Sequence, residues 1–488
     1  MPVQIRLHLI LPVLLILAGC ATTKNFLPDD ANDDQIVHLL NRLSFGPTPE
    51  AIAQVRDQGI DDYIAEQLKP ASLAKSDDLQ QRLADLTTLK ASLKELSKDF
   101  EPPADQFKNM SEDERKQVNK AKNRIVAELQ QAKVLRAILS PAQLQEVMVN
   151  FWFNHFNVFA EKGNDKIWIG DYERDAIRPH ALGKFRDLLK ATAQHPAMLF
   201  YLDNWMDTAP DSPEARGKKQ GINENYAREI LELHTLGVDG GYTQQDVTTL
   251  AEILTGWGLS NGKELWQKSD FYFNPRRHDF ANKTLLGHKI AGSGEAEIES
   301  VLDILASHPS TARHIAFKLA QAFVADEPPK SLIDKLAVSF KETDGDITAV
   351  LHTLFYSKEF WDKQYQQNKF KSPFHYVVSA YRAGKVLPQG DTAAVQGALR
   401  NMGEPLYNCL TPNGYSTTKE QWMNPDALLK RIDFAKSLNK LFDQSNPEQS
   451  ILQSLGKTWS QNTLGAIKDV GPKQKTQLLL NSPEFLYF

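Results

Sequence analysis

One polar stripe on a predicted helix carries the side chains best suited to acid–base chemistry. Over residues 223–236, polar residues recur at spacings of three and four, which places them on one side of an α-helix: Asn225, Arg228, Glu229 and Glu232. Two carboxylates one turn apart can act as acid and base or hold a divalent cation. Arg228 would then orient Glu229 or Glu232, and Asn225 would hold substrate. The alternative is a solvated stripe in which Arg228 and Glu232 form a surface ion pair that adds little stability.

A second stripe consists of amides on the segment 141–159. Its polar members share one face, at spacings of seven, four and three: Gln143, Asn150, Asn154 and Asn157. The rest of the segment is largely aromatic or aliphatic, and asparagine is a poor helix former, so a freely solvated face is not favoured. Buried amides need hydrogen-bond partners. They indicate either an internal polar network or contact with a ligand, and Asn154 is the candidate for holding substrate.

Two histidines lie on the apolar sides of these helices. His234 faces away from the carboxylates, and His155 lies between Phe151 and Phe159. Each is a second candidate for acid–base chemistry. A histidine on an apolar face is more commonly a hydrogen-bonded core residue, so a structural role competes with the chemical one.

Two polar pairs in connecting segments complete the predicted site. Asp203 and Asn204 end a helix before a stretch rich in Pro, Gly and Lys, and His278 and Asp279 follow a predicted strand. Loops of this kind concentrate binding residues. We predict that both pairs bind substrate and that, with the two stripes, they line one pocket. The sequence defines no ligand set for a metal, although the carboxylates leave room for a divalent cation.

Helices must position these segments. Apolar residues recur at three and four over the ranges 141–159, 182–193, 223–236, 243–257, 309–324, 331–341, 346–356, 373–383 and 424–442. Residues 271–273 and then 283–290, around Gly287, predict a small β-hairpin within about 265–295. The sequence therefore predicts a mainly α fold, one large multi-helix domain over 34–488 with a small β-hairpin insertion. A charged helical hairpin at about 75–135, with arms at 77–98 and 111–139, would pack on this domain or project from it.

The first 33 residues predict export and lipidation. Arg6 precedes an apolar run over 7–17 that has the length of a signal peptide and is too short to span a bilayer. The sequence Leu17-Ala18-Gly19-Cys20 resembles the lipobox of bacterial lipoproteins, so we expect removal of residues 1–19, lipid on Cys20 and a polar tether over 20–33. Two or three acyl chains would anchor the protein to a membrane. Ala21, in place of Asp, favours the outer membrane where an organism has two membranes. An ordinary secretory peptide with a chance cysteine is the alternative.

Composition and missing motifs exclude several classes of protein. A formal net charge of −5 over 488 residues gives no electrostatic footprint for nucleic acid. Cys20 and Cys409 are the two cysteines, so a disulfide framework and a cysteine-rich zinc site are not expected. The sequence has no HExxH, GxSxG or Walker motif, and no GxGxxG after a strand. Common metalloproteases, serine hydrolases and nucleotide or dinucleotide enzymes are therefore disfavoured.

Several segments resemble the domain-of-unknown-function 1800 family. Residues 223–237, followed by 240–247 and 254–257, carry most of the resemblance, and shorter segments agree: 39–47, 151–156, 201–204, 278–279, 308–309 and 482–485. Together they cover nearly everything from about 34 to 488. One departure is Phe153, where members of the family commonly have a histidine. The name of the family states that its activity is not established, so the resemblance implies kinship and leaves the chemistry open.

Two classes of function fit these features. The first is an enzyme, a hydrolase or lyase, that acts on polysaccharide or other polymers of the cell envelope through carboxylate and histidine chemistry. Trp205 and Trp257, expected to be exposed near the central segments, would support polymer binding. The second is a non-catalytic envelope binding or scaffold protein, in which the same segments form the core of the fold.

Overall fold

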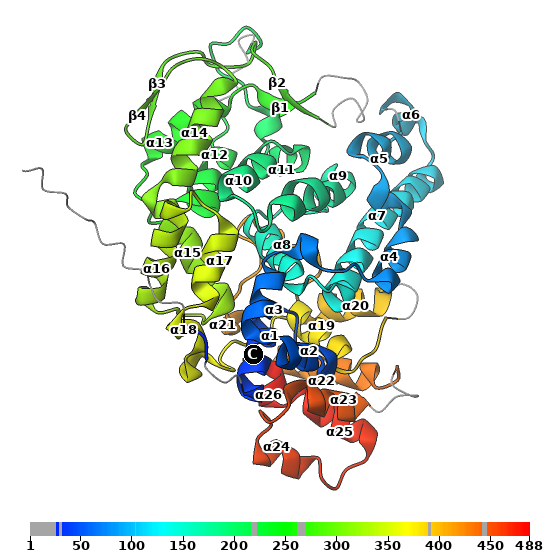
Figure 1. Cartoon of the computed structure of the whole chain (residues 1–488). Helices are drawn as coiled ribbons and strands as arrows, with labels where there is room; N and C mark the ends of the chain where they lie inside the picture. The colour runs from blue at the N-terminus through cyan, green and yellow to red at the C-terminus, as the bar shows by residue number, and fades with distance from the viewer. Residues whose placement is uncertain are drawn as a thin grey trace, which may run out of the picture.

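Most of the chain folds into α-helices. The computed structural model describes residues 26–28, 32–102, 104–215, 222–260, 270–388, 392–441 and 447–488. The expected signal peptide and Cys20 lie outside the described residues. Of the described residues, 64% are helical and 4% are in strands or bridges, which confirms the predicted mainly α fold (Figure 1). Among the described residues, every helix is too short or too polar to cross a membrane.

The elements follow in chain order. The first part of the chain forms α1 (Asp33–Leu43), α2 (Pro49–Gln58), α3 (Ile60–Gln67), α4 (Asp77–Ala84), α5 (Leu93–Phe100), α6 (Ala104–Asn109), α7 (Glu112–Leu139), α8 (Gln143–His155), α9 (Asp165–Asp171), the π-helical turn η3 (Tyr172–Ile177), α10 (Phe185–Ala193) and α11 (Pro196–Tyr201). The middle part forms α12 (Asn225–Glu229), a second π-helical turn η6 (Ile230–Thr235), α13 (Gln244–Leu254), β1 (Trp257–Leu259), β2 (Phe271–Phe273), β3 (Lys283–Leu285), β4 (His288–Ile290), α14 (Ala296–Ser307), α15 (Pro309–Phe323), α16 (Lys330–Glu342), α17 (Ile347–Phe355) and α18 (Lys358–Trp361). The last part forms α19 (Pro373–Ala383), α20 (Ala393–Met402), α21 (Lys419–Trp422), α22 (Pro425–Leu438), α23 (Pro447–Leu455), α24 (Gln461–Ala466), α25 (Pro472–Leu480) and α26 (Pro483–Leu486). Short 3₁₀ turns are η1 (Pro70–Ser72), η2 (Thr87–Lys90), η4 (Arg178–His180), η5 (Asn204–Met206) and η8 (Lys363–Tyr365).

The charged segment at 75–135 has a long second arm and a broken first arm. α7 is 28 residues long and begins with a capping box at Ser111. The expected helix at 77–98 divides into α4, η2 and α5, because Ser92 caps a new helix after the 3₁₀ turn. α4 and α5 pack along α7, and α7 in turn packs on α9. The segment is thereby joined to the body of the molecule (Figure 1).

α8 and α19 form the centre of the fold. Trp152 of α8 and Phe156, the residue that follows α8, are fully buried, and α19 is buried over most of its length. One contiguous apolar cluster extends from α1 to α26 among the described residues. α1 and α2 pack against α23, so the beginning and the end of the described chain lie side by side (Figure 1).

The β structure consists of two small antiparallel pairs. β3 and β4 form the predicted hairpin, with Gly287 at φ +80° in its turn. β2 pairs with β1, which lies where the sequence predicted the end of a helix and outside the range predicted for strands. The helix ends early because Gly256, at φ +81°, turns the chain away from the helical path. Trp257 of β1 is 1% exposed, so its expected exposure is wrong.

Candidate active site

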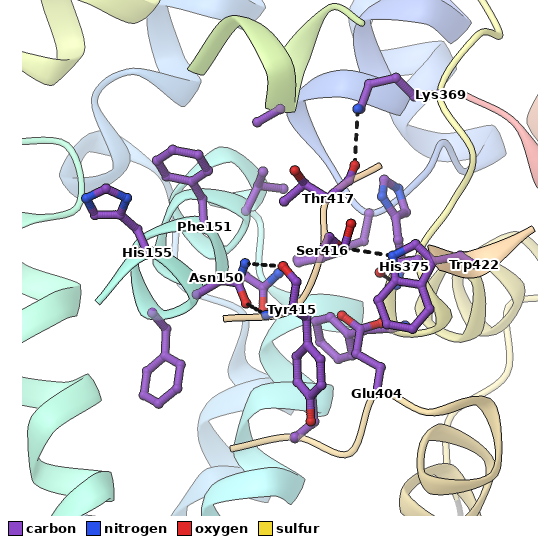
Figure 2. A pocket seen from close by; sticks show the side chains of 18 of the residues that line it. Asn150, Phe151, His155, Lys369, His375, Glu404, Tyr415, Ser416, Thr417 and Trp422 are labelled. Atoms are coloured by element: carbon purple, nitrogen blue, oxygen red, sulfur yellow. Dashed lines mark hydrogen bonds between the residues drawn. The ribbon is translucent and has the colours of Figure 1, made fainter. Parts of the chain in front are cut away.

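A cavity of about 160 Å³ lies between α8, α15, α19 and the segment 404–422 (Figure 2). Buried residues such as Lys133 and Glu404 form its floor. Partly exposed residues such as Asn150, Lys318 and Thr417 form its mouth. A concave site with a few convergent polar groups is the usual form of a ligand-binding pocket.

Glu404 is held at the floor by the end of one helix and the start of another. α20 ends at Gly403, at φ +90°, and the Glu404 N–H donates to the Leu399 carbonyl at 2.9 Å in a Schellman pattern. The Glu404 carboxylate accepts a hydrogen bond of 2.7 Å from the Phe374 N–H, in the first turn of α19. Burial raises the pKa of Glu404 to about 7, although the Phe374 bond and nearby Lys133 act in the opposite direction. The carboxyl group can therefore exchange a proton near neutral pH.

Lys133 brings a buried positive charge to the same floor. Its ammonium lies 4.8 Å from the centre of the Tyr407 ring and 5.0 Å from that of Phe153. Glu173, on the π-helical turn η3, lies 3.6 Å from Lys133 and accepts a hydrogen bond of 2.6 Å from the Tyr407 hydroxyl. Phe153, the position that departs from the family pattern, is thus part of the cavity wall, with its ring against this cation.

Three more cations line the cavity. Lys369 pairs with Asp326. Arg42 donates to backbone carbonyls through Nη2, whereas its buried Nε and Nη1 have no partner among the described residues. Lys318 forms no ion pair with a described acidic residue, and burial lowers its pKa. Because Glu404 is the one acidic side chain among the described lining residues, the cavity has an excess of positive charge and suits an anionic group.

His375 of α19 lies near these cations. Its Nε2 is buried and has no hydrogen-bond partner in the described part of the chain. Burial, followed by the charges of Lys371 and Arg42, holds the pKa of His375 well below its usual value. The ring is therefore neutral, and one of its nitrogens is open to a ligand.

The amide stripe of α8 is divided between structure and cavity. Asn154 donates to the Tyr415 carbonyl at 2.9 Å and accepts from the Tyr415 N–H at 2.8 Å. Asn157 donates to the carbonyls of Cys409 and Thr411 at 3.0 and 2.9 Å. Both residues, with Asn150, also line the cavity. The helix ends at His155, before the predicted end at 159, so Asn157 lies just beyond it. The internal network and the ligand-facing position, which the sequence left as alternatives, are therefore combined in the segment 150–157.

The carboxylate stripe does not reach this cavity. Asn225, Arg228, Glu229 and Glu232 are absent from its lining, so this cavity differs from the pocket that the sequence predicted both stripes to share. Arg228 bonds Glu224 and Gln244, each at 2.9 Å, rather than Glu232. The regular helical arc predicted for 223–236 ends at Glu229, because the π-helical turn η6 widens each turn and rotates the residues that follow.

Glu229 and Glu232 still lie close enough to interact. Burial, followed by the charge of Glu232, raises the pKa of Glu229. Glu232 accepts a hydrogen bond of 3.3 Å from the Tyr242 hydroxyl. Asn225 donates to the Leu202 carbonyl at 3.3 Å, which is a structural contact.

The two candidate histidines meet where α8 contacts η6. His155 Nε2 lies 3.1 Å from the His234 carbonyl, and the two rings are 6.2 Å apart. His314 of α15 lies 6.0 Å from His155. Burial lowers the pKa of all three rings. In the described part of the chain, no group of three or more His, Cys, Asp or Glu side chains is placed to hold a metal ion.

The loop candidates have structural contacts. Asp203, at φ +61°, accepts a hydrogen bond of 2.7 Å from Lys162, and buried Asn204 donates to the Trp257 carbonyl at 3.1 Å. Neither lines the cavity. The Asn204 contact holds the end of α11 against β1, and the Asp203 contact joins it to the segment that follows α8.

His278 and Asp279 are also internal. The His278 ring lies between the Thr255 carbonyl, at 2.7 Å, and the Glu297 carboxylate, at 2.9 Å, with its side chain fully buried. Asp279 accepts from the Ala281 N–H at 2.8 Å and closes a turn. The pair therefore fixes the β region and lies outside the cavity lining.

Sequence reasoning missed six lysine, arginine, histidine or glutamate residues of the described cavity lining: Arg42, Lys133, Lys318, Lys369, His375 and Glu404. For two of them a signal existed. Arg42 and Lys133 interrupt apolar helical faces, where an unpaired charge is costly and needs a reason. For the others, no local pattern in the sequence pointed to a place in the cavity lining.

Comparison with known proteins gives one match. The model of the family described as "Protein of unknown function (DUF1800)" matches residues 38–487. No curated protein and no solved structure matches the chain. The match spans α8, α19, Glu404 and the cations of the cavity floor. The chain therefore belongs to the DUF1800 family of proteins of unknown function.

Proposed function

We propose that this protein is an enzyme that cleaves an acidic polymer of the cell envelope by lyase chemistry in the Glu404 cavity. The observation that supports it is the presence of a buried carboxyl, Glu404, and an imidazole nitrogen without a partner, that of His375, in one cation-rich cavity (Figure 2). The two groups differ in protonation near neutral pH. The Glu404 carboxyl, with a pKa of about 7, is still partly protonated, whereas the His375 ring carries no extra proton because its pKa is lowered. An acid and a base are thus available together.

The chemistry assigned to each residue follows from these states. In a lyase that cleaves beside a carboxylate, a base removes the proton from the carbon next to that carboxylate, and His375 Nε2 accepts it. Arg42 and Lys318 stabilise the negative charge that develops on the carboxylate. The electron pair forms a carbon–carbon double bond while the carbon–oxygen bond to the leaving unit breaks. Glu404 gives its proton to the leaving oxygen.

A hydrolase of the usual two-carboxylate type fits less well. Such enzymes need a second acidic residue across the scissile bond. Glu404 is the single acidic side chain among the described residues that line the cavity. The excess of cations favours a substrate with its own negative charge.

We also propose that a lipid on Cys20 holds the enzyme at a membrane, the outer one where there are two. The apolar run over 7–17 and the Leu17-Ala18-Gly19-Cys20 sequence support this placement. The polar tether would let the folded part reach polymers near the membrane surface.

The test is a turnover assay with full-length protein in detergent. Uronic-acid oligosaccharides, with sulfated and phosphorylated oligosaccharides as parallel arms, are incubated with the enzyme and the products are weighed by mass spectrometry. A lyase yields fragments whose masses add up to that of the substrate, one of them with a new ultraviolet-absorbing double bond. A hydrolase adds the mass of one water.

Matched variants identify the site. Glu404→Gln should lower turnover by about 10²- to 10⁴-fold, the range for loss of a general acid. Glu342→Gln, at an exposed position on α16, should leave it unchanged. Saturable binding of every oligosaccharide with no product would overturn the enzymatic proposal and favour the non-catalytic binding protein.

A further inference from the structure

A second cavity lies directly beside the first. Its volume is about 360 Å³, and the same segments supply residues to both cavities. α1 contributes Asn41 to the second and the adjacent Arg42 to the first. The segment after η8 contributes Gln367 to the second and Lys369 to the first. Phe488 lines both.

Phe488 is the residue that the two described linings have in common. The Arg42 guanidinium lies 4.8 Å from the centre of the Phe488 ring, and the centre of the His375 ring lies 4.3 Å from it. Arg42 and His375 both line the first cavity. The backbone of Phe488 is fixed by two hydrogen bonds with Lys369, of 2.8 and 3.1 Å. Phe488 is therefore shared by the two linings, and two ligand groups on either side of it would be neighbours.

The floor of the second cavity has uncharged polar atoms without partners. Atoms of this kind, among the described residues, are His38 Nδ1, Asn41 Oδ1 and Gln367 Nε2. His38 and Asn41 are 4% and 2% exposed, so these atoms are cut off from bulk solvent. Buried polar groups without partners are costly unless a ligand or ordered water satisfies them.

The hydrogen-bond character of these atoms defines the ligand. His38 Nε2 lies 2.8 Å from the Phe360 carbonyl, which can only accept, so Nε2 carries the proton and Nδ1 is an acceptor. Asn41 Oδ1 is a second acceptor, and Gln367 Nε2 is a donor. A hydroxyl group both donates and accepts, so neighbouring hydroxyls of a sugar match this mixture. Charged side chains of this cavity, such as Lys363 and Lys457, are exposed at its rim.

We propose that the two cavities are adjacent subsites of one cleft, and that the second binds a neutral, hydroxyl-rich sugar unit joined to the anionic unit in the first. The ligand is then an acidic oligosaccharide of at least two units that passes the Phe488 ring. This inference takes its ligand class from the proposed function, but it concerns binding and does not require turnover.

The test compares the binding of short and long ligands by calorimetry with full-length protein in detergent. The probes are a free uronic acid and a disaccharide that joins it to a neutral hexose. The wild-type protein should bind the disaccharide about tenfold more tightly, which corresponds to about 1.4 kcal/mol. Equal affinities for the two probes would overturn the inference.

Variants of the second cavity should remove the extra affinity for the disaccharide and leave the affinity for the free uronic acid unchanged. Asn41→Ala and Gln367→Gly should bring its affinity close to that of the free uronic acid, whose own affinity stays constant. Glycine suits position 367 because its φ is +50°. Gln364→Ala, at an exposed position of the neighbouring turn η8, is the matched control and should keep the full gain.

The outcomes separate this inference from the proposed function. A length-dependent gain without any product keeps the cleft and removes the lyase. Product formation from oligosaccharides in the turnover assay, together with equal affinities for the two probes, keeps the lyase and removes the second subsite. A loss of affinity for both probes in Asn41→Ala and Gln367→Gly, with unchanged thermal melting, also contradicts the assignment.

Discussion

The side chain of Asn154 and the backbone of Tyr415 are joined by two hydrogen bonds. Asn154 Nδ2 donates to the Tyr415 carbonyl at 2.9 Å, and the Tyr415 N–H donates to Asn154 Oδ1 at 2.8 Å. The pair ties α8 to the segment that forms one side of the cavity mouth. Gly414 allows the close approach, since a Cβ there would lie 2.2 Å from the Asn154 backbone oxygen and its φ is +71°.

Loss of this pair should loosen the mouth of the cavity. Asn154→Ala removes both hydrogen bonds and should lower the free energy of unfolding by roughly 1–3 kcal/mol, with weaker binding of acidic ligands. Gly414→Ala, which pushes the same segment away, should weaken binding as well. Asn408→Ala, exposed in the same segment, is the control. Thermal melting and calorimetry check the prediction, and unchanged binding in both variants would show that the mouth does not depend on the pair.

The stability of the protein should carry the signature of Glu404. Its pKa is about 7 in the folded state and near 4.5 when the residue is solvated. Between about pH 4.5 and 7, Glu404 is therefore protonated in the folded protein and ionised in the unfolded chain. The contribution of Glu404 to the free energy of unfolding falls as the pH rises through this range and is constant above it. Its size is up to roughly 3 kcal/mol.

Glu404→Gln should remove that contribution. We expect the variant to gain stability relative to wild type as the pH is raised from about 5 to 8, while Glu342→Gln tracks wild type throughout. Chemical denaturation at several pH values measures the difference. A constant difference between Glu404→Gln and wild type over this range would mean that the carboxyl group titrates normally.

How far the sequence predicted this fold depends on which interactions define each element. The helices over 309–324 and 373–383 were correct because apolar spacing and capping residues are local signals. β1 was missed because its strand character comes from pairing with β2, which is a tertiary contact. The π-helical turn η6 was missed because a regular wheel assumes a constant rotation per residue.

The sequence identified residues of the cavity lining only where a local pattern indicated burial. Asn154 was found because an amide on an aromatic helix signals a polar network. Glu404 follows a glycine helix end in a segment with no chemical motif, and its pKa depends on burial by distant segments. No local pattern predicts that these side chains meet in one cavity, because Arg42, Lys133 and His375 come from three separate helices.

His278 should prove to be a stability residue. Its ring bridges the Thr255 carbonyl and the Glu297 carboxylate, and Lys283 lies 3.3 Å from the same carboxylate, so removal of the ring leaves a buried charge short of a partner. His278→Ala should lower the free energy of unfolding by roughly 3 kcal/mol, whereas His288→Ala, exposed on β4, should have little effect. Denaturant unfolding tests this. Intact stability together with a loss of ligand binding would show instead that His278 binds substrate, as the sequence predicted.

Cys20 is the residue on which membrane attachment should depend. Cys20→Ser removes the thiol that would carry the lipid, so the variant should incorporate no labelled fatty acid and should accumulate as uncleaved precursor. Cys409→Ser, at a buried position far along the chain, is the control and should be processed normally. Metabolic labelling and membrane fractionation provide the readout. Lipid labelling of Cys20→Ser at the wild-type level would contradict the assignment.

Glu229 and Glu232 provide the sharpest test of where the chemistry takes place. The sequence presents them as an acid–base pair, and Glu232 does raise the pKa of Glu229, yet neither carboxylate lines the Glu404 cavity. The double variant Glu229→Gln, Glu232→Gln should therefore retain turnover within about threefold of wild type, against the 10²- to 10⁴-fold loss expected for Glu404→Gln. Neutralising two adjacent carboxylates also removes their repulsion, so the double variant should melt at or slightly above the wild-type temperature at neutral pH. The opposite result, with turnover lost in the double variant and kept in Glu404→Gln, would move the reaction from the floor of the cavity to the carboxylate stripe at the end of α12.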